Sequence, residues 1–446
     1  MNISQWLDTI EPKALDQTDP RQLPETFKRK RRQMHTPTTS ETQMDVALDV
    51  APDATPPIKR QRPNNPIDND LYMNRTPRAR SGKAWSISDK TTSSRSSVTS
   101  TSRTSPTKRL ARLEVAPENP VLVAQISRND TRIPAELKAI LGELDSFQSR
   151  VGIVPSYLGT EIDARAEYDD NFYNFTPSTF EADSAATISD PKLSLYEILK
   201  VFESARECLN EDHAEATWNT LVHWPVFELA LGSIADVAEA ANPVSAPRDQ
   251  AECESRQQPI RVRGMPCTTA RLIDRTHGSK MVDYCIFVEP QAREATKIAQ
   301  LRERFLYINH TDYYPLRRRP IVLSAESKKP GENARNAQLQ LSVWQAAQWA
   351  ILEKMLSAGE ETERPAAVPF LPALIIQGHE WHFAASTRFN NETILWIQQP
   401  IGATESILGI FQIVRALRHI AAWIRGTYWP WYRRAVLHLQ ETDRSI

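Results

Sequence analysis

The segment 321–328, IVLSAESK, constrains the fold of this chain more than any other feature. Its first five residues are apolar or small, as in a buried strand, yet it also carries Glu326 and Lys328. Burying a carboxylate and an ammonium costs several kcal/mol unless other groups compensate them. Because alternate residues of a strand share a face, Glu326 and Lys328 project side by side, about 6.5–7 Å apart along the strand. The segment therefore predicts a polar site on a core strand.

This strand belongs to a longer succession of helical and strand-like runs. Two helices are predicted at 191–210 and 215–240, with Pro225 producing a kink or marking a first turn. Strands follow at 268–274, 281–288 and 320–327, then a long helix at 336–356. Further strands are predicted at 372–378, 380–387 and 393–399, before a last helical region at 406–434. This order predicts an α/β body with a mixed sheet flanked by helices.

The N-terminal part of the chain has a different composition. Residues 1–110 hold 19 Lys and Arg against 12 Asp and Glu, whereas the whole chain has a net charge of −1. The segment 89–109 consists almost entirely of hydroxyl and basic residues, which bury too little apolar surface to offset their ordering entropy. We therefore expect a disordered basic tail at 1–115, a partly helical lead-in at 116–190, the α/β domain at 191–435 and a C-terminal tail at 436–446.

Several features bear on cellular location. The N-terminus shows no charged and apolar signal-peptide pattern, and the chain contains no run of 18 apolar residues. Its four cysteines form no CxxC pair, so a reducing compartment is expected. The run Lys28, Arg29, Lys30, Arg31 and Arg32 is typical of a nuclear import signal, although it can also be a solvated charge run. We expect a nuclear or otherwise cytoplasmic protein that is not secreted, meets no membrane and binds an import receptor through this run.

A second unusual acid, Asp283, lies in the preceding strand-like run MVDYCIFV. Aspartate is depleted in strands, so its presence on a core strand needs a reason. Asp283 and Glu326 together could hold a divalent cation such as Mg²⁺ or Mn²⁺ through oxygen ligands. Lys328 beside them could position a water or stabilise charge on a phosphate, which suits phosphodiester hydrolysis. Alternatively, Glu326 and Lys328 leave the core at the strand end and simply face water.

The segments MVDYCIFV, NHTDYYPLRRRPIVLSAESKKPG and AQLQLSVWQAAQW resemble the PD-(D/E)xK nuclease superfamily. In particular they are similar to the nuclease-like domain of uncharacterised fungal proteins. The resemblance implies a restriction-endonuclease-like αβββαβ core with a metal-dependent phosphodiesterase site. It also implies that Asp283 is the motif aspartate, Glu326 the second acid and Lys328 the motif lysine.

The resemblance suggests further site residues. Glu215, at the head of a predicted helix, matches the acid that members often carry before the sheet, although it also suits a helix N-terminus. Gln340 matches the glutamine of a Q-x-x-x-Y motif, but Trp344 replaces the tyrosine. Arg317, Arg318 and Arg319 precede the motif strand, where they either contact a phosphate backbone or form a solvated strand entry.

Two functions from different classes are compatible with these features. The first is a metal-dependent nuclease that acts on DNA. The second is a catalytically inactive nuclease-like fold that serves as a nuclear protein- or nucleic-acid-interaction module. The divergent helix motif and the long insertion 289–319, expected to form a helix and an extended segment, favour the second function.

Overall fold

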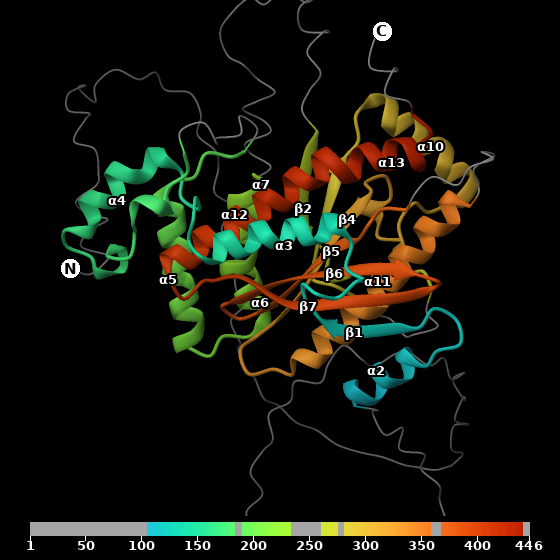
Figure 1. Ribbon diagram of the computed structural model, residues 1–446, viewed down its shortest axis with the longest axis horizontal. Helices are drawn as coiled ribbons and strands as arrows, with labels where there is room; N and C mark the ends of the chain where they lie inside the picture. The colour runs from blue at the N-terminus through green and yellow to red at the C-terminus, as the bar shows by residue number, and fades with distance from the viewer. Residues whose placement is uncertain (1–104, 183–189, 233–259, 275–280, 358–366, 440–446) are drawn as a thin grey trace, which may run out of the picture. The chain divides into compact units, whose positions relative to one another are not determined.

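A computed structural model describes residues 105–182, 190–232, 260–274, 281–357 and 367–439. Seven strands form one mixed sheet in the order β1-β7-β6-β5-β4-β3-β2 (Figure 1). The strands are β1 (Val121–Gln125), β2 (Arg261–Pro266), β3 (Tyr284–Glu289), β4 (Ile321–Lys328), β5 (Leu371–Gln377), β6 (Glu380–Phe389) and β7 (Glu392–Ala403). The α-helices are α2 (Pro106–Glu114), α3 (Ala135–Gln148), α4 (Gly159–Ala166), α5 (Leu195–Asn210), α6 (Glu215–Trp218), α7 (Trp224–Leu231), α10 (Ala292–Phe305), α11 (Ala334–Leu356), α12 (Ile407–Trp423) and α13 (Trp429–Ala435).

The centre of the sheet has the predicted αβββαβ order. After helices α5 to α7, strands β2, β3 and β4 form an antiparallel meander. Helix α11 then crosses over to β5, which pairs with β4 in parallel. Strands β6 and β7 extend the sheet in antiparallel fashion, and β1 pairs with β7 in parallel. The predicted α/β fold with a mixed sheet is therefore confirmed.

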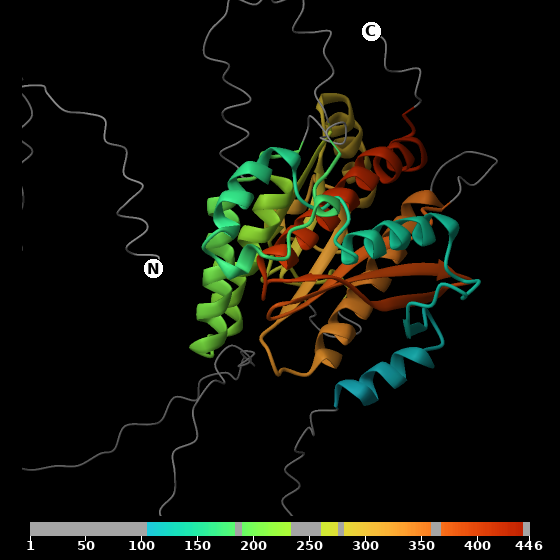
Figure 2. The same cartoon turned by 60° about the vertical axis from the view of Figure 1, so that its left-hand side comes forward.

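Helices cover the sheet on both faces because its strands are apolar on both sides. On β3, Ile286 belongs to the core formed with α3, α5, α7 and α12. Its neighbour Phe287 points the other way, into a smaller core formed with α11 and Leu113 of α2. Figures 1 and 2 show α3 and α12 lying along one face while α11 passes across the other.

Two helices contain a π-turn immediately before a Trp-Pro pair. Residues Asn219–His223 form the first π-turn, and α7 then begins with Trp224 and Pro225. Residues Ile424–Tyr428 form the second, and α13 begins with Trp429 and Pro430. Proline has no N–H to donate to the preceding turn, and the wider turn accommodates it without ending the helix. Pro225 thus lies in the first turn of α7, directly after a π-turn, and does not end the helix.

The prediction of a strand at 268–274 is wrong. This segment is a turn and irregular chain in which Leu272 makes an isolated bridge to Thr311. The edge strand is instead β2, where Val262 pairs opposite Val288. An edge strand pairs on one side only, so it tolerates Arg263 and Pro266 and lacks the apolar pattern of a core strand.

Ordered elements also lie outside the predicted α/β domain 191–435. The last residues of the predicted tail form α2, whose Leu113 is buried, and β1 in the lead-in completes the sheet. Leu437 and Leu439, placed in the predicted C-terminal tail, are buried as well. All the described residues belong to one compact unit. The remaining tail residues, including the basic run 28–32, lie outside the described part of the chain.

Among the described residues, the continuous helix Ile407–Ala435 is long and apolar enough by composition to cross a membrane. Its most apolar window is 72% buried inside the protein. Phe411 and Ile413, for example, are fully covered in the main core.

Candidate active site

Glu326 and Lys328 lie at the end of a strand that is buried along its whole length. β4 runs between β3 and β5, so both edges of the strand are hydrogen-bonded. The Glu326 side chain is 1% exposed, and the Lys328 Nζ donates to its Oε1 at 2.6 Å. Lys328 Nζ also donates to the backbone carbonyl of Ser327 at 2.7 Å. The two residues therefore do not face water but form a buried charged pair.

Asp283 stands one residue before β3 and is tied to both neighbouring segments. Its backbone N–H donates to the Ala325 carbonyl at 3.0 Å, and its carbonyl accepts from the Cys267 N–H at 2.7 Å. Its Oδ2 accepts from the backbone N–H and the hydroxyl of Ser327, both at 2.8 Å. Because Ser327 lies between Glu326 and Lys328, these bonds hold the Asp283 carboxylate beside the charged pair.

Glu215 adds a third carboxylate from a different part of the chain. It is the first residue of α6, and its Oε2 lies 3.3 Å from Lys328 Nζ. Its side chain is 32% exposed, so it marks the edge at which the cluster reaches solvent. The structure thus brings together four residues that span 113 positions of the sequence, namely Glu215, Asp283, Glu326 and Lys328.

The cluster holds more negative than positive charge. Burial raises the pKa of Glu326 well above 4.5, and the nearby Asp283 carboxylate raises it further. Burial also raises the pKa of Glu215, with a smaller contribution from Asp283. Burial acts to lower the pKa of Lys328, but the surrounding carboxylates outweigh it and hold the ammonium charged. Three carboxylates around one ammonium leave an excess that a proton or a cation must neutralise.

One oxygen of the cluster is available to a cation. Glu326 Oε2 is buried and accepts no hydrogen bond from any described residue. Within the described part of the chain, no three His, Cys, Asp or Glu side chains form a ready-made metal cluster. Mg²⁺ does not require one, because it commonly binds one or two carboxylates and completes its shell with waters and phosphate oxygens. Asp283 and Glu326 fit this pattern.

Gln340 lies on α11, near the start of the Asp283 segment. Its Nε2 donates to the carbonyl of Met281 at 3.2 Å, two residues before Asp283. Trp344, which replaces the expected tyrosine, is buried and donates to the Ser324 hydroxyl at 2.8 Å. In this structure both side chains support the strands, and neither contacts the carboxylates.

The three arginines lie at the opposite end of β4 from the carboxylates. They precede Ile321, and Glu326 follows five residues later, about 16 Å along the strand. Arg319 is bound to the Glu289 carboxylate at 3.0 Å, as a structural ion pair. Arg317 stacks over the ring of Tyr314 at 3.4 Å, and Arg318 is exposed. The structure does not bring them to the predicted site.

The insertion between the two motif strands contains the expected helix, α10. Its Glu294 is buried and forms an ion pair with Arg433 of α13 at 2.9 Å. Ile298 joins the main core on the same side. These contacts anchor α10 to the C-terminal helix.

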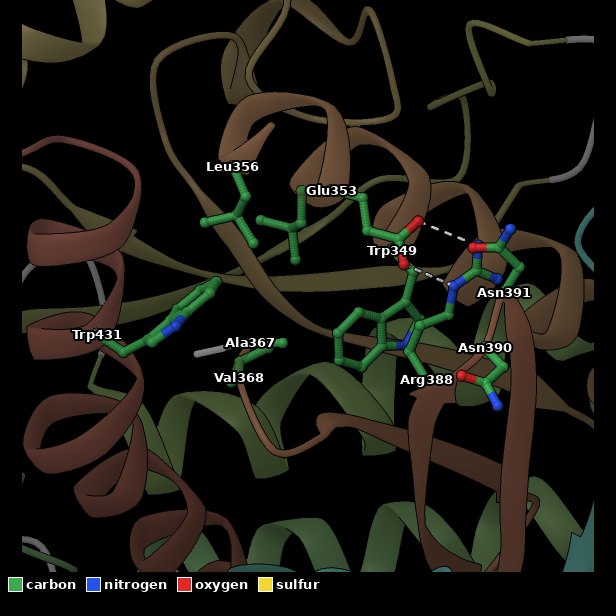
Figure 3. A pocket seen from close by; sticks show the side chains of 10 residues that line it. Trp349, Glu353, Leu356, Ala367, Val368, Arg388, Asn390, Asn391 and Trp431 are labelled. Atoms are coloured by element: carbon green, nitrogen blue, oxygen red, sulfur yellow. Dashed lines mark hydrogen bonds and ion pairs between the residues drawn. The ribbon is translucent and has the colours of Figure 1, made fainter. Parts of the chain in front are cut away.

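A pocket of about 190 Å³ lies far from the charged cluster. Figure 3 shows Trp349, Leu356 and Trp431 around it, with the Glu353–Arg388 ion pair at its rim. Glu380 of β6 and Lys328 of β4 both pair with Gln377 of β5, which lies between them. Arg388 lies eight residues further along β6 than Glu380, so about 25 Å of strand separates the pocket from the cluster.

Three polar residues at the site escaped the sequence interpretation. Ser327 binds Asp283, Asn219 contacts Ser327 at 2.7 Å, and His223 contacts Asn219 at 2.9 Å. Asn219 and His223 lie in a segment that we interpreted as one amphipathic helix. The sequence did contain a signal for these two residues, because Asn219 and His223 are polar, lie four residues apart and interrupt the apolar pattern of that helix.

One of three comparisons with known proteins found a match. A family model described as the PD-(D/E)XK nuclease superfamily matches residues 161–429, more than half of the chain. No curated protein and no solved structure matches the chain. The matched region contains the β2–β3–β4–α11–β5 core and all four residues of the charged cluster. The chain belongs to the PD-(D/E)XK nuclease superfamily.

Proposed function

We propose that this protein hydrolyses phosphodiester bonds in nucleic acid, with DNA as its substrate, using Mg²⁺ or Mn²⁺ held by Asp283 and Glu326. The buried Oε2 of Glu326, which has no hydrogen-bond partner among the described residues, carries the proposal, because it lies in a cluster with an excess of negative charge. Burying such an oxygen without a partner is costly, and a divalent cation would remove that cost. Glu215, at the exposed edge, would bind the ion through water.

Lys328 contributes the positive charge of the site. Its ammonium is held between Glu326 and Glu215, which keep it protonated and fix its position. From there it can orient the attacking water or donate to a phosphate oxygen in a buried environment, where such bonds are strong. When bound, the metal ion supplies a water of lowered pKa and neutralises phosphate charge.

Titration calorimetry of Mg²⁺ and Mn²⁺ into the full chain tests the metal site. We expect saturable binding by the wild type and none by Asp283→Asn or Glu326→Gln. Lys328→Met should still bind metal, because Lys328 is not a ligand, but cleave about 100-fold more slowly. Glu353→Gln, which alters an ion pair at the remote pocket, is the matched control and should behave as wild type.

A cleavage assay on supercoiled plasmid, linear duplex, single-stranded DNA and RNA tests the reaction and its substrate. Cleavage by the Asp283→Asn/Glu326→Gln double variant at the wild-type rate would refute the proposed mechanism. Preference for RNA over every DNA form would refute the proposed substrate alone.

The interaction-module alternative draws on one observation. Gln340 and Trp344, the counterparts of the Q-x-x-x-Y motif, bond to the Met281 carbonyl and the Ser324 hydroxyl and not to the carboxylates. This alternative predicts equal calorimetric traces for the wild type and Asp283→Asn, no cleavage of any substrate, and loss of partner binding when residues 1–104 are removed.

We also propose nuclear import through the basic run 28–32, which carries five consecutive positive charges. Replacing all five residues by alanine should move a fluorescent fusion from the nucleus to the cytoplasm. Unchanged nuclear accumulation would refute this role.

A further inference from the structure

A chain of polar contacts connects the β5–β6 turn to the carboxylate of Asp283. The carbonyl of Gly378 lies 2.9 Å from His223 Nε2, and His223 Nδ1 lies 2.9 Å from the Asn219 side-chain amide. The same amide atom lies 2.7 Å from Ser327 Oγ, which in turn lies 2.8 Å from Asp283 Oδ2. The chain thus joins four elements: the turn, the π-turn of the α6–α7 helix, β4 and the Asp283 segment.

The direction of these hydrogen bonds follows from the protonation state of His223. The imidazole is fully buried beside the rings of Trp218 and Trp381. Burial lowers its pKa to about 4, so it is neutral near pH 7 and carries one N–H. The Gly378 carbonyl can only accept, so that N–H must be on Nε2. Nδ1 is then left as an acceptor.

An acceptor at Nδ1 fixes the orientation of the Asn219 amide. The atom that faces both Nδ1 and Ser327 is placed as Oδ1, but amide oxygen and nitrogen are assigned from their hydrogen bonds. Two acceptors would face each other if oxygen stood there. With Nδ2 in that position, its two N–H groups donate to His223 Nδ1 and to Ser327 Oγ. The Ser327 hydroxyl proton is then available to Asp283 alone.

The opposite orientation would deprive Asp283 of a donor. If Asn219 Oδ1 faced Ser327, the hydroxyl would donate to the amide, and only the Ser327 backbone N–H would reach Asp283. That arrangement also requires His223 to carry both protons, or to turn a lone pair toward the Gly378 carbonyl. Neither suits a buried imidazole that no carboxylate among the described residues contacts.

We propose that His223, Asn219 and Ser327 are positioning residues that form a one-way hydrogen-bond relay and fix Asp283 Oδ2, so that Oδ1 is presented to the divalent cation. The inference rests on the proposed metal site. The Tyr284 hydroxyl, which donates to the Asn219 carbonyl at 3.0 Å, holds the π-turn against β3 and keeps the relay in register. Outer hydrogen bonds to metal ligands typically contribute 10- to 100-fold to metal affinity.

The first test needs no metal. Two-bond ¹H–¹⁵N correlation spectra of the full chain should show His223 as the neutral Nε2–H tautomer near pH 7. In Asn219→Asp, the new carboxylate can only accept, so His223 should become protonated on both nitrogens. A wild-type Nδ1–H tautomer, or a His223 spectrum unchanged by Asn219→Asp, would overturn the relay.

Calorimetry with Mg²⁺ alone gives the second readout. Ser327→Ala and Asn219→Asp should each weaken Mg²⁺ binding about 10- to 100-fold, and Ser327→Thr, which keeps the hydroxyl, should restore most of it. Ser386→Ala is the matched control, because Ser386 is an equally buried strand serine that binds Trp349 and Gln345 instead. It should leave Mg²⁺ affinity unchanged.

The outcomes separate the relay from the metal site. If Asp283→Asn abolishes Mg²⁺ binding while Ser327→Ala and Asn219→Asp bind as wild type, the relay is refuted and the metal site stands. If Asp283→Asn itself binds Mg²⁺ as wild type, the proposed metal site fails, and the presentation of Oδ1 to a cation fails with it.

Discussion

Glu326 lies in surroundings that are unfavourable to the protein's own stability. Its carboxylate is buried, one oxygen has no partner among the described residues, and Asp283 and Glu215 add like charge. Proteins retain such groups where a ligand later compensates them, at a cost to the unliganded fold. The cost should therefore be measurable in the metal-free protein.

The pH dependence of stability provides that measurement. The folded protein holds the Glu326 proton more tightly than the unfolded chain does. The resulting contribution to the free energy of unfolding is fully present below pH 4.5 and is lost as the pH rises through the raised pKa of the folded state. In EDTA at pH 8 we expect Glu326→Gln to be more stable than the wild type by about 1 kcal/mol or more, with the two converging near pH 4.5. Urea unfolding across this pH range measures the difference.

Mg²⁺ should reverse the order at pH 8. An ion that binds only the folded wild type stabilises it by mass action and leaves Glu326→Gln unchanged. If the difference in unfolding free energy between the wild type and the variant stays constant from pH 4.5 to 8, the pKa of Glu326 is not raised by the fold.

At the scale of elements, the site depends on the close approach of two turns. Gly378, in the β5–β6 turn, has a φ of +56°, and its N–H donates to the Lys328 carbonyl at 2.8 Å. A Cβ at this position would lie 2.4 Å from Pro330 Cγ. Only glycine permits both the left-handed backbone and the contact with the proline ring.

We predict that Gly378→Ala destabilises the fold by about 2–4 kcal/mol, since left-handed strain adds to a clash with a rigid ring. Gly331→Ala is the matched control, because Gly331 also has a positive φ of 78° but open space around it. It should cost about 1 kcal/mol. Urea unfolding of both variants measures the difference. Equal losses of unfolding free energy would show that Pro330 moves away from the added Cβ at no cost in stability.

For the whole folded unit, the sheet is completed by a segment that precedes the helices of the nuclease core. β1 pairs with β7 along five residues, from Val121 opposite Thr393 to Gln125 opposite Ile397. Leu113 of α2 packs with Val121 in the core on the α11 face. Without these elements, β7 would be an exposed edge strand carrying Ile394 and Trp396.

Two truncations test this arrangement. Removing residues 1–104 should leave the melting temperature and Mg²⁺ affinity unchanged, because every described element remains. Removing residues 1–126 should destabilise the fold by about 3 kcal/mol or more and promote association through the bare β7 edge. Thermal unfolding and size-exclusion chromatography report both effects. A monomeric, equally stable product of the longer deletion would show that β1 is dispensable.

Much of the central fold could be predicted because its signals are local. The strands 320–327 and 372–378 and the helix 336–356 were recognisable from apolar runs and periodicity. β2 was missed because an edge strand bearing Arg261 and Arg263 has no apolar pattern, and β1 because five residues give too weak a signal. Asp283 and Glu326 could be singled out as candidate site acids because each is out of place in an apolar, strand-like run of the sequence.

The sequence by itself determined the buried strand with its acid and lysine, the second acid before it and the α/β order of the core, since these depend on neighbouring residues along the chain. Only the tertiary structure decided that Glu215 joins the cluster, that the three arginines lie at the far end of β4, and that Asn219 and His223 reach Asp283 through Ser327. The physical reason is that the positions of these side chains depend on which ends of the helices and strands lie together in the fold and on the register of the π-turn. Hydrogen bonds across such junctions join residues more than a hundred positions apart, and no local pattern specifies them.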